Sequence, residues 1–153
     1  MNRFLVGSEA LEPGIAKTYI ALSDNRTELI GYYSIDCGTV DQVNGAYHEK
    51  IGGAVHLRCF ALDKRYHHEI QEMTSTGKAV YVSDMLLESC LDRIEYIRSN
   101  FIGAEFVTLA STREGEKLYR RHGFDDLDED ISFSPTSGED DCIRLYLPLD
   151  YEA

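Results

Sequence analysis

The sequence predicts a single α/β domain over residues 1–153, with a mixed, mostly antiparallel central sheet flanked by helices. Three features lead to this prediction: two strand-like segments near the start, a long amphipathic helical segment in the middle, and alternating strand and helix segments after it. No repeat, low-complexity stretch or Pro/Gly/Ser linker divides the chain. One domain with both hairpin and crossover connections is therefore expected.

The first segments are typical of a hairpin followed by a third strand. Residues 16–22 are rich in strand formers, residues 23–26 (Ser-Asp-Asn-Arg) suit a turn, and residues 28–37 supply a partner strand. Two glycines then open a strand over residues 54–62, which ends in the charged turn at residues 63–65.

The most regular element is a helix predicted over residues 83–101. Its apolar side chains recur at helical spacing on one face: Leu86, Leu87, Cys90, Leu91, Ile94, Ile97 and Phe101. Ser83 suits the N-cap and Asp84 the first turn, while Gly103 suits the exit.

A buried strand and a second helix are expected to follow. Residues 106–110 form a short apolar run, and residues 112–121 continue as a helix that ends at Gly123. Phe124 begins a further strand, and residues 142–147 close the sheet.

Composition excludes several classes of protein. No apolar run approaches the ~18–20 residues that cross a bilayer, and acids follow the N-terminus too soon for a secretory signal. Lys plus Arg number 15 against 27 Asp plus Glu, and this net charge of −12 argues against nucleic-acid binding. The acidic residues are expected to keep the protein soluble, or alternatively to attract a cationic amine.

The cysteines and the absence of common motifs narrow the chemistry further. The four cysteines are widely spaced without a C-x-x-C pair, so reduced thiols in a cytoplasm are expected rather than a disulfide framework or a metal site. His67 and His68 are adjacent and are expected in a solvated turn. The sequence has no H-E-x-x-H, G-x-S-x-G, G-x-G-x-x-G or Walker motif.

Three linked segments and one hairpin strand carry a family resemblance. They are Val55–Asp63 running into Lys64-Arg65-Tyr66, the helix start Met85-Leu86-Leu87, the segment Glu116–Phe124, and the strand around Tyr32-Tyr33. Taken in their order along the chain, these segments resemble the GNAT superfamily of acetyl-CoA-dependent N-acetyltransferases, over roughly residues 16–149. The Tyr32-Tyr33 strand is also similar to that of the branch containing tRNA-acetylating toxins.

The resemblance implies a fold with splayed central strands and acetyl-CoA as cosubstrate. A bulge near Phe60, Ala61 and Leu62 would separate that strand from residues 106–110 and offer its main chain to the pantetheine arm. Core filling is the alternative role for Phe60 and Leu62, and it is compatible with main-chain binding.

The phosphate-binding segment departs from the family. The usual Q/R-x-x-G-x-G/A loop is replaced by a longer stretch that contains Thr74-Ser75-Thr76-Gly77-Lys78. We expect Gly77, Lys78, Ser83 and Asp84 to bind the diphosphate through an anion nest and a helix start, although the charge of Asp84 repels phosphate. A moved, weakened or lost site is the alternative.

The resemblance assigns catalysis to Tyr119, which would protonate the leaving thiolate. Its alternative role is aromatic packing against the sheet. Candidates for the general base are His56, Glu105 and Glu49, and an ordered water could replace them. Cys59 is interpreted as a structural thiol rather than a nucleophile.

The predicted function is an N-acetyltransferase that acts on an unidentified primary amine, of a small molecule or a peptide, by direct attack in a ternary complex. Two alternatives remain: a tRNA-acetylating toxin-like enzyme that gathers its basic residues locally, and a non-catalytic acyl-CoA-binding or interaction module. Few residues precede the first strand, so an uncovered sheet edge favours a homodimer.

Overall fold

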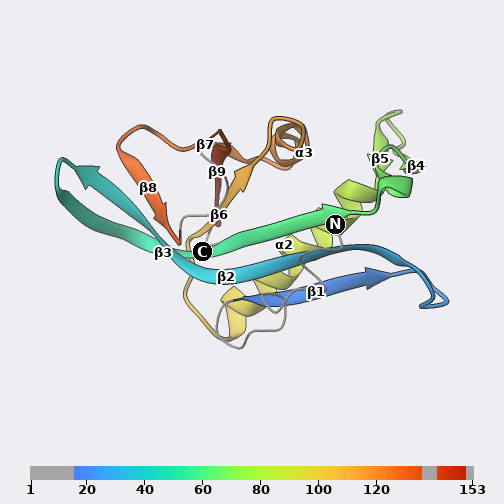
Figure 1. The fold of residues 1–153 in the computed structure, drawn as a ribbon, viewed down its shortest axis with the longest axis horizontal. Helices are drawn as coiled ribbons and strands as arrows, with labels where there is room; N and C mark the ends of the chain where they lie inside the picture. The colour runs from blue at the N-terminus through green and yellow to red at the C-terminus, as the bar shows by residue number, and fades with distance from the viewer. Residues whose placement is uncertain (1–15, 136–140, 151–153) are drawn as a thin grey trace. The chain divides into compact units, whose positions relative to one another are not determined.

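The computed structural model describes residues 16–135 and 141–150, and it has a mixed α/β fold (Figure 1). The elements are β1 (Lys17–Leu22), β2 (Leu29–Asn44), β3 (Tyr47–Leu62), the 3-10 turn η2 (Lys64–Tyr66), β4 (Ile70–Met73), β5 (Ala79–Tyr81), α2 (Val82–Asn100), β6 (Phe106–Ser111), α3 (Glu116–Arg121), β7 (Asp125–Asp126), β8 (Ile131–Ser134) and β9 (Ile143–Pro148). None of the described helices is long and apolar enough to cross a membrane.

The strands form one seven-stranded sheet and one separate hairpin. The sheet has the order β1-β2-β3-β6-β9-β7, with β8 added beside β2, and β4 pairs with β5. β3 and β6 are parallel, whereas β6–β9, β7–β9 and β2–β8 are antiparallel. The predicted mixed, mostly antiparallel sheet is confirmed.

The chain divides into two compact units, and each contains two stretches of sequence. Unit 1 comprises Met1–Ser34 and Cys59–Ile97, and unit 2 comprises Ile35–Arg58 and Arg98–Ala153. The units are described separately below. The expectation of a single domain stays a prediction.

In unit 1, α2 packs on β2. The apolar face predicted for this helix is buried at Leu86, Leu87, Cys90 and Ile94, with the last three fully inaccessible to solvent. Gly31 of β2 lies against this face, because a Cβ atom there would stand 2.9 Å from Leu86 Cδ2. Burial of each large apolar side chain contributes about 1.5–3 kcal/mol, so this face anchors the helix.

In unit 2, β6 is the most deeply buried strand. Val107 and Leu109 are fully covered, and Leu145 of β9 and Phe124 complete this apolar layer. A second cluster joins Val40, Ala54 and Phe133. The apolar run predicted as a buried strand is therefore confirmed.

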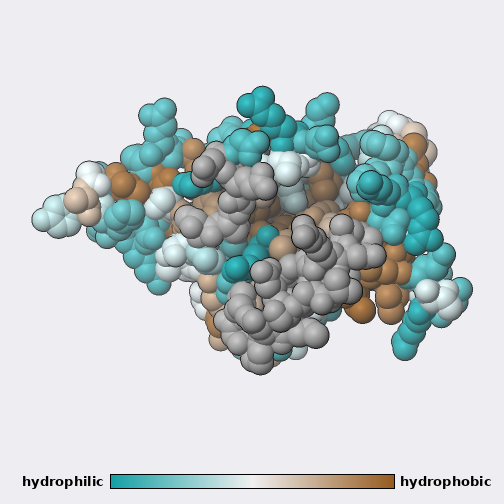
Figure 2. Space-filling view, in the orientation of Figure 1, coloured by the Kyte–Doolittle hydropathy of each residue, from teal (hydrophilic) through white to brown (hydrophobic). Residues whose placement is uncertain are grey.

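In Figure 2 hydrophilic side chains lie along much of the margin of the coloured surface, and hydrophobic side chains show between them. This surface agrees with the 27 acids and 15 bases of the chain. Apolar side chains remain exposed at a few places, and Ile70 and Met73 of the β4 strand are 50% and 59% exposed.

Several element boundaries differ from the prediction. β2 and β3 extend to a tight turn that contains Gly45, whose φ of +64° suits glycine, so the third strand begins at Tyr47 rather than after two glycines. The second helix begins at Glu116, after a turn at residues 113–115. Phe101, expected on the buried face of α2, follows the end of that helix and is 69% exposed.

Two elements were not predicted at all. The segment at residues 70–81 forms the β4–β5 hairpin, and Ile131–Ser134 forms β8. All four residues of β4 are exposed, so no burial pattern marked the strand in the sequence.

A substitution at Gly31 tests the packing in unit 1. A Cβ atom at this position would lie 2.5 Å from the Ala61 carbonyl oxygen, which belongs to the backbone and cannot move aside cheaply. Gly31→Ala is expected to lower the free energy of unfolding by about 1–3 kcal/mol in urea denaturation. The control is Gly103→Ala, where a Cβ atom meets nothing within 4 Å. Equal stability of both variants would contradict the packing described.

The core of unit 2 also holds a buried histidine. His56 of β3 is fully inaccessible, and its Nδ1 lies 3.0 Å from Thr108 Oγ1 of β6. Burial, the largest influence, lowers the pKa of His56 to about 4. The imidazole is therefore neutral at pH 7.

This histidine predicts acid sensitivity. Between pH 6.5 and about 4 the unfolded chain binds a proton at His56 that the folded chain does not, so stability falls as the pH is lowered through this window. The full loss at this residue is about 3 kcal/mol. Denaturation at several pH values should show a shallower decline for His56→Asn than for the natural chain. Parallel declines would show that His56 titrates normally.

Candidate active site

The end of β3 carries the residues expected to meet the pantetheine arm. β3 pairs with β6 from Ala54↔Phe106 to Leu57↔Leu109, and then continues to Leu62. β6 itself ends at Ser111, so the splaying of the two strands near Phe60, Ala61 and Leu62 stays a prediction. Phe60, Ala61 and Leu62 are half-buried, and the Leu62 carbonyl oxygen lies 3.0 Å from His67 Nε2.

Gly77 and Lys78 lie in the turn of the β4–β5 hairpin. Gly77 has a φ of +78°, and its amide donates to the Thr74 carbonyl at 2.8 Å. The Lys78 amide donates to Thr74 Oγ1 at 3.0 Å, and the Thr74 amide donates to the Lys78 carbonyl at 2.9 Å. The sequence signal interpreted as a phosphate nest is thus that of a tight hairpin turn, whose exposed group is the Lys78 side chain.

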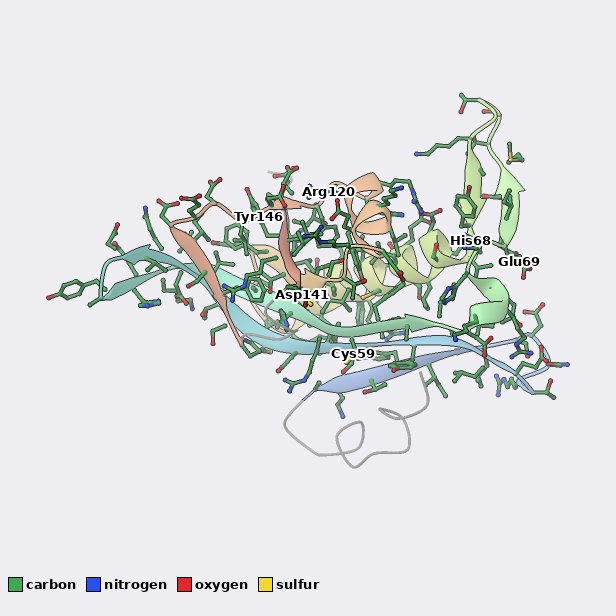
Figure 3. The ribbon with its side chains drawn as sticks, turned by 45° about the horizontal axis from the view of Figure 1, so that its top comes forward. Cys59, His68, Glu69, Arg120, Asp141 and Tyr146 are labelled. Atoms are coloured by element: carbon green, nitrogen blue, oxygen red, sulfur yellow. The ribbon has the colours of Figure 1, made fainter. Side chains whose placement is uncertain are left out.

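Ser83 and Asp84 lie in the first turn of α2. The helix begins at Val82, and the Asp84 carboxylate reaches back to accept a hydrogen bond from the Tyr81 amide at 2.9 Å. Tyr81 is therefore the N-cap position rather than Ser83, and Asp84 supplies the carboxylate half of a capping box. The Val82 amide donates to the carbonyl of Glu69, which lies at the foot of the hairpin (Figure 3).

Tyr119 lies on α3 in unit 2. Tyr119 is 8% exposed, and its ring meets the Phe124 ring edge to face, with 5.7 Å between the ring centroids. Its carbonyl accepts the His122 and Phe124 amides, which close the helix before Gly123. The ring therefore packs against the core, as the alternative interpretation required, and this contact is compatible with a catalytic phenol.

The candidates for the general base differ in their environments. His56 is buried, and the lowering of its pKa to about 4 by burial makes it a weak base. Glu105 is exposed and lies over Gly52, and Glu49 is exposed on β3. Burial disfavours His56, and nothing in unit 2 selects between the two glutamates.

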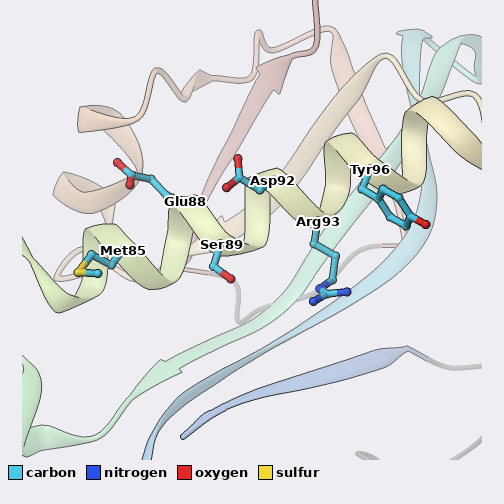
Figure 4. A pocket seen from close by; sticks show the side chains of 6 residues that line it. All are labelled: Met85, Glu88, Ser89, Asp92, Arg93 and Tyr96. Atoms are coloured by element: carbon cyan, nitrogen blue, oxygen red, sulfur yellow. The ribbon is translucent and has the colours of Figure 1, made fainter. Parts of the chain in front are cut away.

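A surface groove on α2 was not anticipated from the sequence. It has a volume of about 550 Å³ and is lined by Met85, Glu88, Ser89, Asp92, Arg93 and Tyr96 (Figure 4). None of these positions except Met85 was singled out in the sequence, because they lie off the predicted apolar face of the helix and periodicity gives no sign of a hollow. Arg93 is held there, because its Nε donates to Tyr33 Oη at 3.1 Å and its guanidinium lies over the Tyr19 ring. The groove contains none of the expected site residues.

Three arginines that a basic surface for RNA could use are paired with acids. Arg58 meets Asp36 at 3.5 Å, and Arg65 meets Glu28 at 2.9 Å. Such surface pairs add little stability but reduce the local positive charge. Arg120 is paired with carboxylates in the same way.

Arg120 on α3 lies 2.9 Å from Asp126 and 3.4 Å from Glu116. Its charge is therefore shared with two carboxylates.

Over residues 16–135 and 141–150, no group of three or more His, Cys, Asp or Glu side chains could hold a metal ion. The four cysteines are free thiols.

No protein-family model and no curated protein matches the chain. Solved structures do match over most of its length. A structure described as AtaTR bound with AcCoA has a TM-score of 0.61 and 14% identity, covering 88% of this chain and 70% of that one. The KacTA–DNA complex has a TM-score of 0.60 and 17% identity, covering 96% and 77%. A bacterial toxin has a TM-score of 0.60 and 16% identity, covering 87% and 67%. The chain therefore shares the fold of these three structures, which agrees with the GNAT-like fold predicted from the sequence.

Proposed function

We propose that the chain is an N-acetyltransferase that moves an acetyl group from acetyl-CoA to a primary amine of a small molecule or peptide. The fold and its similarity to an AcCoA-bound structure support an acetyl-CoA-dependent acetyltransferase. The amine and the direct transfer in a ternary complex come from the resemblance of the motifs. A homodimer is part of the proposal, because an edge strand of a sheet is commonly covered by a partner.

The observation that carries the proposal is the length of β3 relative to its ladder with β6. The ladder ends at Leu57, and the strand continues through Phe60, Ala61 and Leu62. The pantetheine arm contains two amides and can add to a strand as a short peptide does. We propose that the main chain of these three residues holds it.

Tyr119 is proposed as the general acid. Acetyl-CoA supplies an acetyl group activated as a thioester. The amine nitrogen forms the new C–N bond as the C–S bond breaks, the amine proton passes to a base or water, and the phenol gives its proton to the departing sulphur. A phenol with an ordinary pKa near 10 is protonated at neutral pH and so is available as a donor.

The diphosphate end of CoA is proposed to lie toward the foot of the hairpin and the start of α2. The Ser83 hydroxyl lies at the start of α2, while the Lys78 ammonium and the turn shaped by Gly77 lie at the far end of the hairpin. Asp84 acts in this proposal by fixing the first turn through its bond to Tyr81.

A toxin-like enzyme that acetylates aminoacyl-tRNA is the second candidate, favoured by the similarity in fold to a bacterial toxin. The ion pairs of Arg58, Arg65 and Arg120 with carboxylates weigh against an extended basic surface for RNA. Acetylation assays with free amines, peptides and charged tRNA in parallel would separate the two candidates.

A thermal-shift titration tests the proposal against a non-catalytic interaction module. A ligand at 100 times its dissociation constant stabilises the folded chain by about 2.7 kcal/mol. Acetyl-CoA and free CoA are both expected to raise the unfolding temperature. Absence of a shift with both would leave the interaction module as the better hypothesis.

The role of Tyr119 predicts a specific kinetic defect. Tyr119→Phe removes the proton donor but keeps the ring that packs on Phe124. Turnover measured by thiol release is expected to fall by about 10²–10³-fold with little change in acetyl-CoA affinity. Tyr96→Phe, on the exposed face of α2, is the matched control and should retain normal turnover. Normal turnover of Tyr119→Phe would remove the residue from the mechanism.

A further inference from the structure

We propose that this chain recognises its donor through the pantetheine arm and gains little affinity from the diphosphate and nucleotide. Its donor class is then the acyl-pantetheine thioesters, of which acetyl-CoA is one member. This inference rests on the proposed function and concerns the specificity of the same site. Its observations all lie within unit 1, at the start of α2 and in the β4–β5 hairpin.

Two of the four amides that open α2 already have acceptors. The Tyr81 amide donates to Asp84 Oδ2 at 2.9 Å, and the Val82 amide donates to the Glu69 carbonyl at 3.1 Å. An anion site at a helix start uses such amides as its donors. A diphosphate could use these two amides only by displacing their present hydrogen bonds.

The charge at the helix start also opposes an anion. Asp84 is 6% exposed, so its carboxylate is poorly screened by water. It lies in the first turn, where it complements the partial positive charge of the helix dipole. Asp84 therefore already compensates the partial positive charge at the helix start, and a second anion would be attracted less strongly.

Three amides of the hairpin turn are also occupied. The amides of Thr74, Gly77 and Lys78 all donate within the turn, to the Lys78 carbonyl, the Thr74 carbonyl and Thr74 Oγ1. A backbone nest that used these amides would have to break the turn's own hydrogen bonds. The Lys78 ammonium lies on an exposed turn, where a solvated point charge contributes little.

The pantetheine arm, rather than the diphosphate, should therefore supply most of the affinity for the donor. Each hydrogen bond to a charged group adds about tenfold or more to affinity, so a site with several amides on the diphosphate favours CoA over pantetheine by about 10²-fold or more. Main-chain pairing with β3 does not distinguish the two ligands. This chain should therefore bind them with similar affinity.

Calorimetric titration of the full chain with CoA and with pantetheine tests the inference. The two dissociation constants are expected to agree within about tenfold. CoA bound more than about 100-fold tighter than pantetheine would overturn the inference while supporting the proposed function. Failure of both ligands to bind would overturn both.

A pair of variants on one helix tests the electrostatic part. Asp84→Asn removes the buried charge while its amide oxygen can still accept from Tyr81, and it is expected to tighten CoA binding by about 3–10-fold without changing pantetheine binding. Asp92→Asn changes the net charge equally on the exposed face of α2 and should affect neither ligand. CoA binding that is unchanged or weaker in Asp84→Asn would contradict the inference. Thermal unfolding of each variant checks that it is folded, and the comparison in the natural chain does not depend on either.

Discussion

The ladder between β3 and β6 ends before β3 does, and the proposed chemistry depends on this mismatch. Hydrogen bonds join the two strands from Ala54↔Phe106 to Leu57↔Leu109, while β3 continues to Leu62. On its other side β3 has β2 as neighbour, and the Asp63 amide donates to the Ile30 carbonyl at 2.8 Å just beyond the strand. We propose that the part of β3 beyond this ladder pairs with an extended ligand that has amides of its own.

Packing within each unit holds the two parts of β3 in place. In unit 2 the ladder lies in a dry layer, where Val55, Leu57, Val107 and Leu109 are nearly or fully inaccessible. In unit 1 Gly31 brings β2 close to the Ala61 carbonyl and to Leu86 of α2. Cores packed this closely resist small displacements, so the point where the ladder ends is well defined.

The start of α2 illustrates how one segment serves either stability or anion binding. Amides capped by Asp84 and by the Glu69 carbonyl stabilise the helix, and the same amides are then unavailable to phosphate. The hairpin at residues 70–81 provides this closure, because Glu69 directly precedes β4. The departure of the sequence from the family's phosphate loop thus has a structural counterpart.

Regular apolar patterns made much of the fold predictable. The α2 helix buries one face at helical spacing, β6 is a short apolar run, and the bounds of α2, β6 and β9 were predicted within a few residues. The exposed β4 strand has no such pattern, and β8 lies in an acidic region, so neither was predicted. Composition identified Thr74–Lys78 as special but could not tell a phosphate nest from a hairpin turn, since both require glycine and hydroxyl residues.

The candidate site was less predictable because it depends on where hydrogen bonds go. Spacing placed Ser83 at the N-cap, whereas the reach of the Asp84 side chain moves the cap to Tyr81. The burial of His56, which weakens it as a base, follows from its position in the β3–β6 ladder and has no sequence signature. The groove around Arg93 depends on Tyr19 and Tyr33 from two other elements.

Amide hydrogen exchange along β3, with and without acetyl-CoA, tests the central claim most directly. If the arm pairs with the strand, exchange should slow at one or more amides of Phe60–Leu62 on ligand binding. The amides of Ala54–Leu57, already in the ladder, should keep their rates. Binding that leaves Phe60–Leu62 unchanged would contradict main-chain recognition by β3.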